Sequence, residues 1–314
     1  SCSISPVSTR YEGELRKLLN SIKKQEFPWM YDVSKYAPQQ AIKNLGAAFV
    51  NFFAKRAQFP KFKNKYHHDS FEIGNDQLKV DGRYLIIPKL KPIKMKESLR
   101  FNGSIKTAVL SRTAGKWFVS LSIEVDDESI VLSKKHAIGI DLGIKAFATY
   151  FDGVKHWDSP TLKPYRILQN RIKVLSKQLS RKNKGSNNRY KARVQLAKLH
   201  SSIANIRKDY LHKLTHFLTN NYSIIGIETL DVKSMSKNRL LSKSILDAGF
   251  YEFSRQLQYK SNLYGSTIVK SDKFYPSTKL CSKCNYKLAT LSLSVRAWTC
   301  PSCNTHHDRD ENAS

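Results

Sequence analysis

Acidic residues are scarce in this chain. Its 314 residues include 25 Asp and Glu against 54 Lys and Arg, which gives a formal net charge of +29. An excess this large repels itself unless a polyanion neutralises it, and nucleic acid is the usual polyanion. A ribosome-associated or merely soluble basic protein would show the same excess, and charge alone does not separate DNA from RNA. We therefore expect nucleic-acid binding that weakens steeply with salt.

Long apolar runs are also missing. No stretch of about 18 apolar residues occurs, so we expect no membrane span. The first residues, SCSISPVSTR, have no initiator Met and no charged segment followed by an apolar one, so we expect no secretory signal. A wholly disordered chain is excluded because 40% of the residues are hydrophobic and 11% are aromatic. The length is sufficient for one or two buried cores.

Cysteine is rare and unevenly placed. One of the five cysteines is Cys2, and the other four lie near the C-terminus with the spacing C-x2-C-x15-C-x2-C: Cys281, Cys284, Cys300 and Cys303. This spacing presents four thiolates to one Zn²⁺ from two knuckles. Two disulfides or four unrelated buried thiols are the alternatives. Because four sulfurs already close a zinc site, His306 and His307 are less favoured as ligands.

The spacing at which apolar residues recur changes once in the first half of the chain. Apolar residues recur with a helical period over residues 12–57, where Pro28 and Pro38 separate two helices. The loop FPKFKNKYHH, residues 59–68, mixes aromatic rings with cations and suits stacking on bases beside phosphates, although a half-buried basic loop has the same composition. Over residues 70–125 the period is two, which predicts a small antiparallel β-barrel or sandwich.

The second half alternates strands and helices. We predict two strands with a glycine turn over 136–153, two long helices over 163–221, a strand over 223–230, a helix over 245–264 and a strand over 267–272. Between Lys163 and Lys213 the helical pair contains 15 Lys and Arg and a single acid, Asp209. A solvated helix face ordinarily mixes both signs. The imbalance therefore predicts a phosphate backbone lying along the two helices.

Three carboxylates are distinguished by their positions. Asp141 and Glu228 each lie at or near the end of an apolar strand, and Asp310 follows the cysteine cluster. A carboxylate beside a buried strand is costly without a cation. If the three converge, they could bind two Mg²⁺ or Mn²⁺ ions for phosphodiester hydrolysis, as in an RNase H-like nuclease. Alternatively, Asp141 caps a turn, Glu228 pairs with a lysine and Asp310 is a helix N-cap.

Several sequence blocks resemble one family. GIDLGIKAFATY, IIGIETL, FYPSTKLCSKCN and WTCPSCNTHHDRDENAS look like the signature blocks of TnpB, and AIKNLGAAFVNFF, FPKFKNK, the Lys-rich helical pair and DAGFYEFSRQLQYKSNLYG also resemble it. TnpB (OrfB) proteins are transposon-encoded RNA-guided DNA endonucleases related to type V CRISPR effectors. The resemblance covers nearly the whole chain, although the family usually begins with a further strand and helix and continues beyond the third acid.

The resemblance implies a mixed α/β and β fold in three parts. These are a helical recognition region over 1–58, a wedge-like β-barrel over 59–130, and a RuvC-type RNase H domain over 131–314. The last part would contain the Lys-rich hairpin, 163–221, and a zinc ribbon, 276–306. By residue-to-residue correspondence, Asp141, Glu228 and Asp310 match the catalytic acids and the four clustered cysteines match the zinc ligands.

The implied activity is cleavage of double-stranded DNA beside a short flanking motif, directed by a guide RNA from the element's own end. We predict that basic side chains hold the nucleic acids, and Lys145 and Arg309 could steer phosphate or form surface ion pairs instead. The candidates are Lys61, Lys63, Lys65, Lys145, Lys173, Lys177, Arg181, Lys182, Lys184, Arg189, Lys191 and Arg309. One structural Zn²⁺ and two catalytic Mg²⁺ or Mn²⁺ ions are expected.

Other functions fit parts of the same pattern. A nuclease-inactive RNA-guided DNA-binding protein would lack at least one of the three acids, and a transposase would join strands rather than simply break them. A plain zinc-ribbon nucleic-acid binder is disfavoured because the ribbon is a small part of the chain. We expect the protein to act in the cytoplasm of a prokaryote, associated with the nucleoid.

Overall fold

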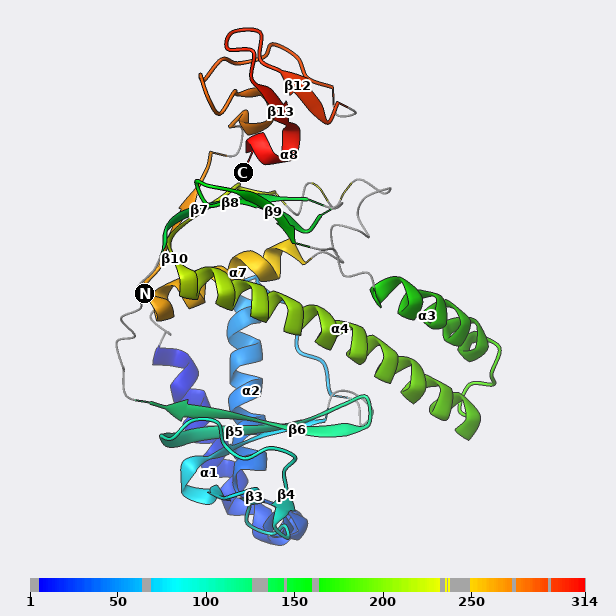
Figure 1. Cartoon of the computed structure of the whole chain (residues 1–314). Coiled ribbons are helices and arrows are strands. Elements are labelled where there is room, and N and C mark those ends of the chain that lie inside the picture. Colours follow the sequence, from blue (N-terminus) through cyan, green and yellow to red (C-terminus); the bar gives the residue numbers. More distant parts are fainter. Residues whose placement is uncertain are drawn as a thin grey trace. The chain divides into compact units, whose positions relative to one another are not determined.

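The computed structural model divides the chain into two compact units, residues 1–128 and 129–314 (Figure 1). It describes residues 6–63, 69–125, 135–143, 146–159, 164–231, 235, 237, 249–272, 275–292 and 295–313, with side chains from residue 12 onward and without those of 135 and 164–167. The predicted contacts Lys65 and Lys145 lie outside the described residues.

The first unit begins with two helices that pack on each other. They are α1, Pro6–Glu26, and α2, Tyr36–Phe53, with a short 3-10 turn at Pro28–Asp32 between them. Both fall where the apolar period predicts helices. The side of α2 lies on the first strand of a sheet, where a side chain at Gly74 would collide with the ring of Tyr36.

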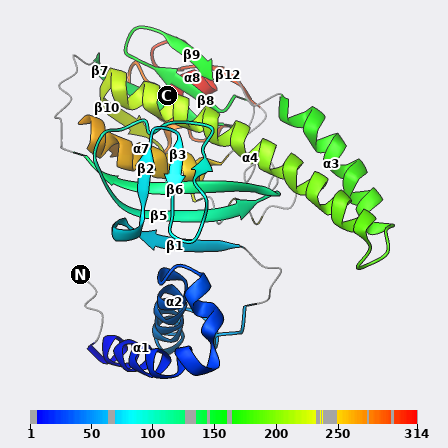
Figure 2. The same ribbon diagram turned by 90° about the horizontal axis from the view of Figure 1, so that it is seen from below.

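Antiparallel strands make up the rest of the first unit. One sheet has the order β1-β5-β6 and the other β2-β3-β4 (Figure 2). Their bounds are β1 Ser70–Gly74, β2 Lys79–Asp81, β3 Tyr84–Ile86, β4 Ile93–Lys94, β5 Ser104–Thr113 and β6 Lys116–Glu124. The described strands therefore form two separate sheets and no closed barrel. Strands of two or three residues, such as β4, offer too few ladder hydrogen bonds to join the sheets.

The second unit contains one five-stranded sheet with the order β11-β10-β7-β8-β9. Its bounds are β7 Lys135–Leu142, β8 Ala148–Phe151, β9 His156–Ser159, β10 Tyr222–Ile227 and β11 Thr267–Lys270. Strands β7, β10 and β11 run parallel, while β8 pairs antiparallel with β7 and β9 pairs antiparallel with β8. The nearly continuous apolar runs of β7 and β10 are typical of parallel strands in the middle of a sheet.

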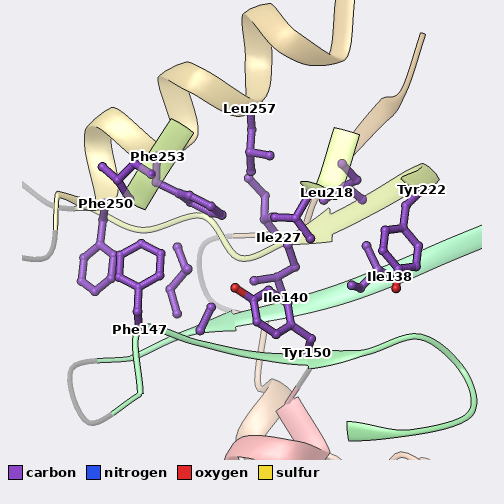
Figure 3. Packing of buried hydrophobic residues seen from close by; sticks show 14 residues of the cluster. Ile138, Ile140, Phe147, Tyr150, Leu218, Tyr222, Ile227, Phe250, Phe253 and Leu257 are labelled. Atoms are coloured by element: carbon purple, nitrogen blue, oxygen red, sulfur yellow. The ribbon is translucent and has the colours of Figure 1, made fainter. Parts of the chain in front are cut away.

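Two helices cover one face of this sheet. They are α4, Asn187–Asn221, and α7, Phe250–Tyr264, and they also pack on each other. Figure 3 shows aromatic rings of α7 against Phe147, which precedes β8. Phe253 is fully buried, and its ring meets that of Phe147 edge-on at 5.3 Å. This core holds the strand ends at which two of the three candidate acids lie.

The Lys-rich segment forms the predicted helical hairpin. Helix α3, Pro164–Ser180, packs along α4, and both views show the pair extending from the sheet (Figure 2). The Ser186 side chain caps α4 by accepting a hydrogen bond from the Arg189 amide. No helix in the described part of the chain is long and apolar enough to cross a membrane.

The last part of the second unit is a small ribbon. It contains a 3-10 turn at Ser277–Lys279, the antiparallel strands β12, Ala297–Thr299, and β13, His306–Asp308, and the helix α8, Arg309–Ala313. Helix α8 contacts both the ribbon and the β7–β8 strands (Figure 1). The C-terminal ribbon is therefore connected to the sheet through α8.

Candidate metal centres and basic surface

The four clustered cysteines converge on one point. Their Sγ atoms all lie within 4.8 Å of one another. The pairs Cys281–Cys303 and Cys284–Cys300 are each separated by 3.6 Å, and all four thiols are free. A disulfide needs a sulfur separation of about 2.05 Å, whereas sulfurs around a tetrahedral Zn²⁺ with bonds of about 2.3 Å lie about 3.8 Å apart. The arrangement fits a zinc site and excludes the disulfide alternative.

Neighbouring side chains orient two of these sulfurs. The Sγ of Cys303 and the Oγ1 of Thr305 are hydrogen-bonded at 3.2 Å, and hydrogen bonding with Thr305 lowers the pKa of the Cys303 thiol to about 6. His307 is buried, and its Nε2 lies 3.1 Å from the Sγ of Cys281. A hydrogen bond to a sulfur is the kind of contact that orients metal ligands. His307 therefore supports the cysteine site without being needed as a fifth ligand.

Asp141 and Glu228 lie side by side at the ends of neighbouring strands. Ile140 of β7 pairs in register with Ile227 of β10, and the two acids are the next residues of these parallel strands. Parallel strands bring their carboxyl ends to the same edge of a sheet, where ligands commonly bind in α/β proteins. Tertiary structure thus joins two carboxylates that are far apart in the sequence.

The charge of Asp310 acts on Asp141, and the charge of Asp141 acts on Glu228. The pKa of Asp141 is raised from 3.8 to about 6, first by burial and then by the charge of Asp310, while Arg309 acts in the opposite direction. Burial and the charge of Asp141 raise the pKa of Glu228 from 4.5 to about 7. Near neutral pH the site therefore holds negative charge that the protein compensates poorly. Such carboxylate oxygens fit a hard divalent cation.

The acids are nevertheless less tightly gathered than the sulfurs. Among the described residues, only the four cysteines form a group whose ligand atoms lie close enough to one another to hold a metal ion, and the three acids form no such group. Asp310 instead faces Arg296, whose Nη1 lies 3.4 Å from its Oδ1. Helix α8 is capped by Asp308, whose Oδ1 accepts hydrogen bonds from the amides of Asp310 and Glu311. The N-cap alternative therefore applies to Asp308, and the carboxylate of Asp310 is left for another role.

Comparison with known proteins supplies the family. The family OrfB_IS605, described as "Probable transposase", matches residues 120–239, and a "Cas12f1-like, TNB domain" matches residues 250–314. A Streptomyces pristinaespiralis protein named "Putative RNA-guided DNA endonuclease" is 36% identical over 302 residues, which cover 93% of this chain and 72% of the relative. This chain belongs to the TnpB (OrfB) family.

A second TnpB-family relative agrees. The Escherichia coli (strain K12) protein named "Putative RNA-guided DNA endonuclease InsQ" is 33% identical over 291 residues, which cover 88% of this chain and 71% of the relative. Among solved structures, a Cas12f1-sgRNA-target DNA complex aligns with 98% of this chain and 90% of its own at 14% identity and a TM-score of 0.41. The sequence relatives carry the assignment to the family.

Most of the predicted nucleic-acid contacts of this TnpB-family chain that can be described are exposed. Lys61 and Lys63 are exposed at the end of the first helical region. On the hairpin, the exposed cations are Lys173, Lys177, Arg181, Lys184 and Lys191, and Lys182 is half-buried. A row of exposed cations along two helices is available to a phosphate backbone.

Two of the predicted arginines have structural neighbours. Arg189 donates from Nη1 to the carbonyls of Leu179 and Lys182, at 2.9 and 2.8 Å, and thereby closes the turn of the hairpin. Arg309 lies close enough to Asp141 to lower its pKa. Whether either side chain contacts nucleic acid stays a prediction.

Sequence reasoning missed Arg296 and Asn312. Arg296 precedes β12 and faces Asp310, and Asn312 belongs to α8 and hydrogen-bonds to the first cysteine knuckle. Asn312 lies two residues after Asp310 in the family-like block WTCPSCNTHHDRDENAS, so a signal for it was present in the sequence. Nothing in the spacing of Arg296 pointed to an acid 14 positions later.

Proposed function

We propose that this chain is an RNA-guided DNA endonuclease of a transposable element, which cleaves double-stranded DNA by two-metal phosphodiester hydrolysis. The observation that carries the proposal is that Asp141 and Glu228 follow the paired residues Ile140 and Ile227 of two parallel strands, where burial raises both pKa values and the charge of Asp310 acts on Asp141. The names of the two relatives, both RNA-guided DNA endonucleases, support the same activity.

The order of the large sheet supports a RuvC-type RNase H fold. Three antiparallel strands, β9-β8-β7, are followed by two strands parallel to β7, and the acids lie at the ends of β7 and β10. In our proposal this domain spans 131–314, with the wedge-like region over 59–130 and the helical recognition region over 1–58. The Lys-rich hairpin, 163–221, and the zinc ribbon, 276–306, belong to the nuclease domain.

The three acids would bind the two metal ions at the cleavage site. Asp141 and Glu228 would hold one Mg²⁺ or Mn²⁺, and Asp310 would help to hold a second. When bound, the two ions activate a water molecule and stabilise the leaving oxygen. Arg309, beside Asp141, would orient the phosphate of the DNA strand. The four-cysteine site would hold one structural Zn²⁺, because four sulfurs leave no open position for hydrolysis.

Nucleic-acid recognition would combine charge with base pairing. The exposed cations of the hairpin, together with Lys61, Lys63, Lys65 and Lys145, would hold the backbones of guide RNA and DNA. Base pairing with the guide would select the target, while the protein reads a short flanking motif. The relatives from Streptomyces and Escherichia coli support action in a prokaryote, and we propose the cytoplasm, at the nucleoid.

Guided cleavage tests the nuclease. The chain is co-expressed with the transcript of its element's end and given a plasmid with the guide's target beside randomised flanking bases. We expect Mg²⁺-dependent breaks that follow a reprogrammed guide and reveal the flanking motif. Asp141→Asn should lower cleavage about a thousandfold or more while leaving RNA binding intact. RNA-dependent binding without cleavage would instead favour the nuclease-inactive alternative, and joined or inserted ends would favour a transposase.

The hairpin is tested through the salt dependence of RNA binding. Replacing Lys173, Lys177 and Lys191 by Ala should reduce the slope of log K against log[salt] by about 2, since each lost phosphate contact contributes about 0.7–0.9. The control variant replaces the exposed Lys270, Lys283 and Lys287, which lie outside the hairpin, and removes the same charge. Equal slopes in the two variants would show that net charge, rather than the hairpin, binds RNA.

A further inference from the structure

Helix α8, which carries Asp310, is attached to the cysteine ribbon by several contacts. It follows β13 directly, and the amide of Arg309 donates to the carbonyl of Arg296 at 2.7 Å. The guanidinium of Arg296 faces the carboxylate of Asp310. A helix of five residues is not stable by itself. The position of Asp310 therefore depends on the ribbon that holds α8.

Asn312 is the most specific of these attachments. Its Oδ1 accepts a hydrogen bond of 3.0 Å from the amide of Ser282, which lies between the ligands Cys281 and Cys284. Its Nδ2 donates to the carbonyls of Leu280, at 2.7 Å, and Ser277, at 3.1 Å. The orientation of the amide group is unambiguous, because Ser282 N can only donate and the two carbonyls can only accept. Both N–H groups of the Asn312 side chain are thus used on the first knuckle.

A second contact joins the same knuckle to the same segment. His307 lies three residues before Asp310, and its Nε2 is 3.1 Å from the sulfur of Cys281. Its ring packs against Trp298, with centroids 4.8 Å apart. Cys281 is therefore connected to β13, and the backbone around it is connected to α8. The geometry of the knuckle determines where the segment 307–312 lies.

Helix α8, which carries Asp310, contacts β7, which carries Asp141. The charge of Asp310 raises the pKa of Asp141, which means that the two carboxylates repel each other when both are ionised. Without a divalent cation, this repulsion favours movement of α8 away from the sheet. Hydrogen bonds from Asn312 to the knuckle oppose that movement, and they require a knuckle that is itself ordered by its metal.

We propose that Asn312 is a positioning residue that couples zinc occupancy of the four-cysteine site to divalent-metal binding at the acids. The cysteine geometry fits zinc, as shown by sulfur separations of 3.6 Å. The proposal rests on the proposed function, since it concerns the same three acids. It gives the ribbon a role beyond its own folding, because a ribbon without zinc would release α8 and with it the third acid.

Binding of Mn²⁺ to the nucleic-acid-free protein tests the coupling without any cleavage measurement. Free Mn²⁺ is followed by electron paramagnetic resonance, and zinc content is measured on the same samples. The test variant is Asn312→Leu, which has a similar volume and forms none of the three hydrogen bonds. The control is Asn170→Leu, the same change at an exposed position of α3. Each protein is titrated before and after treatment with a zinc-selective chelator.

We expect Asn312→Leu to retain one zinc per chain and to bind Mn²⁺ about tenfold more weakly, as for other residues that orient metal ligands. Zinc removal should also weaken Mn²⁺ binding about tenfold in the unmodified chain and in the control. In Asn312→Leu, where Mn²⁺ binding is already weak, zinc removal should weaken it little further. The proposal would be overturned if Asn312→Leu bound Mn²⁺ with unchanged affinity. It would also be overturned if zinc removal weakened Mn²⁺ binding by as large a factor in Asn312→Leu as in the unmodified chain, because the two effects would then be independent. Loss of zinc from purified Asn312→Leu would also overturn it, because Asn312 would then serve the zinc site itself.

The same titration separates this inference from the proposed function. If the unmodified chain binds no Mn²⁺, or if Asp141→Asn binds it equally well, the acids are not a metal site and both proposals fail. If Asp141→Asn abolishes binding and Asn312→Leu leaves it unchanged, only the coupling fails.

Discussion

The two candidate metal centres are built in opposite ways. The cysteine centre takes its ligands from two short knuckles within 23 positions of one another, and its sulfurs lie within 4.8 Å of one another. In our proposal the acidic centre takes its ligands from β7, the residue after β10 and α8. Burial raises the pKa values of Asp141 and Glu228, and the charge of one neighbouring acid raises each of them further. The comparison shows that ligands close together in the sequence can be gathered by local geometry, whereas acids from distant segments meet only through the tertiary fold, which also brings their negative charges together.

The largest expected effect is on the cysteine centre. Cys281→Ser removes one of the four sulfurs, so the ribbon should lose its zinc. It would lose with it the binding free energy of structural zinc, which contributes about 10–16 kcal/mol to the folding of small zinc domains. We expect proteases to cut within 276–306 while the large sheet persists, which limited proteolysis and mass spectrometry would reveal. Cys2→Ser, the matched control, should keep its zinc. A zinc-free ribbon that resists proteolysis would show that its small core folds without metal.

We expect the core of the large sheet to unfold independently of the ribbon. Phe253→Ala removes a fully buried ring that packs against Phe147 and should lower the free energy of unfolding by about 3–5 kcal/mol. Urea unfolding measures the change, and zinc content should stay the same. The control is Tyr251→Ala on the same helix, which is 72% exposed and should cost little. Zinc loss in Phe253→Ala would mean that the two centres do not fold separately.

The acidic centre should make the metal-free protein more stable as pH falls. The folded pKa of Asp141, about 6, lies above its ordinary value of 3.8, so the folded state takes up the proton first. The free energy of unfolding should therefore rise as pH falls from about 7 to 4. Asp141→Asn should remove its own share of this slope and leave the share of Glu228, whose folded pKa of about 7 is also raised by burial. The variant should be about 1–2 kcal/mol more stable at pH 8, below the limit of about 3 kcal/mol that two pKa units imply.

Thermal or urea unfolding at several pH values measures this slope. Added Mg²⁺ should flatten it in the unmodified chain, because a bound cation favours the ionised acids. Asp209→Asn, in an exposed ion pair with Lys213, provides the control and should leave the slope unchanged. A slope of unchanged size in Asp141→Asn would assign the pH dependence to other groups.

The smallest expected effect concerns the contact between the two centres. Arg296→Gln removes a cation whose side chain is 58% exposed and lies 3.4 Å from Asp310. Because exposed ion pairs contribute little, we expect Mn²⁺ binding to strengthen by only about two- to fivefold, as measured by titration. Arg255→Gln, in the exposed pair with Glu252, should not change it. Weaker Mn²⁺ binding in Arg296→Gln would mean that Arg296 positions Asp310 rather than competing for it.

Much of the fold could be predicted from local patterns. The apolar periods indicated the helices of the first region, the helical hairpin and the strands that became β7 and β10. The predicted barrel was wrong in its closure: the described hairpins form two three-stranded sheets. Alternating apolar and polar residues identify a strand and its buried face. Closure of a barrel depends instead on which edge strands pair, and the alternation within a single strand does not specify its partner.

The sequence by itself determined the cysteine centre, the basic hairpin and the identity of the candidate acids. These properties are local: the spacing within each knuckle sets where sulfurs point, and charge along a helix follows directly from its residues. Only the tertiary structure decided that Asp141 and Glu228 end neighbouring strands, that Asp310 faces Arg296 and that Asn312 holds α8 to the first knuckle. These interactions join distant segments, and the charge of Asp310 acts on Asp141, which lies 169 positions earlier. They exist only after the chain has folded and buried its core.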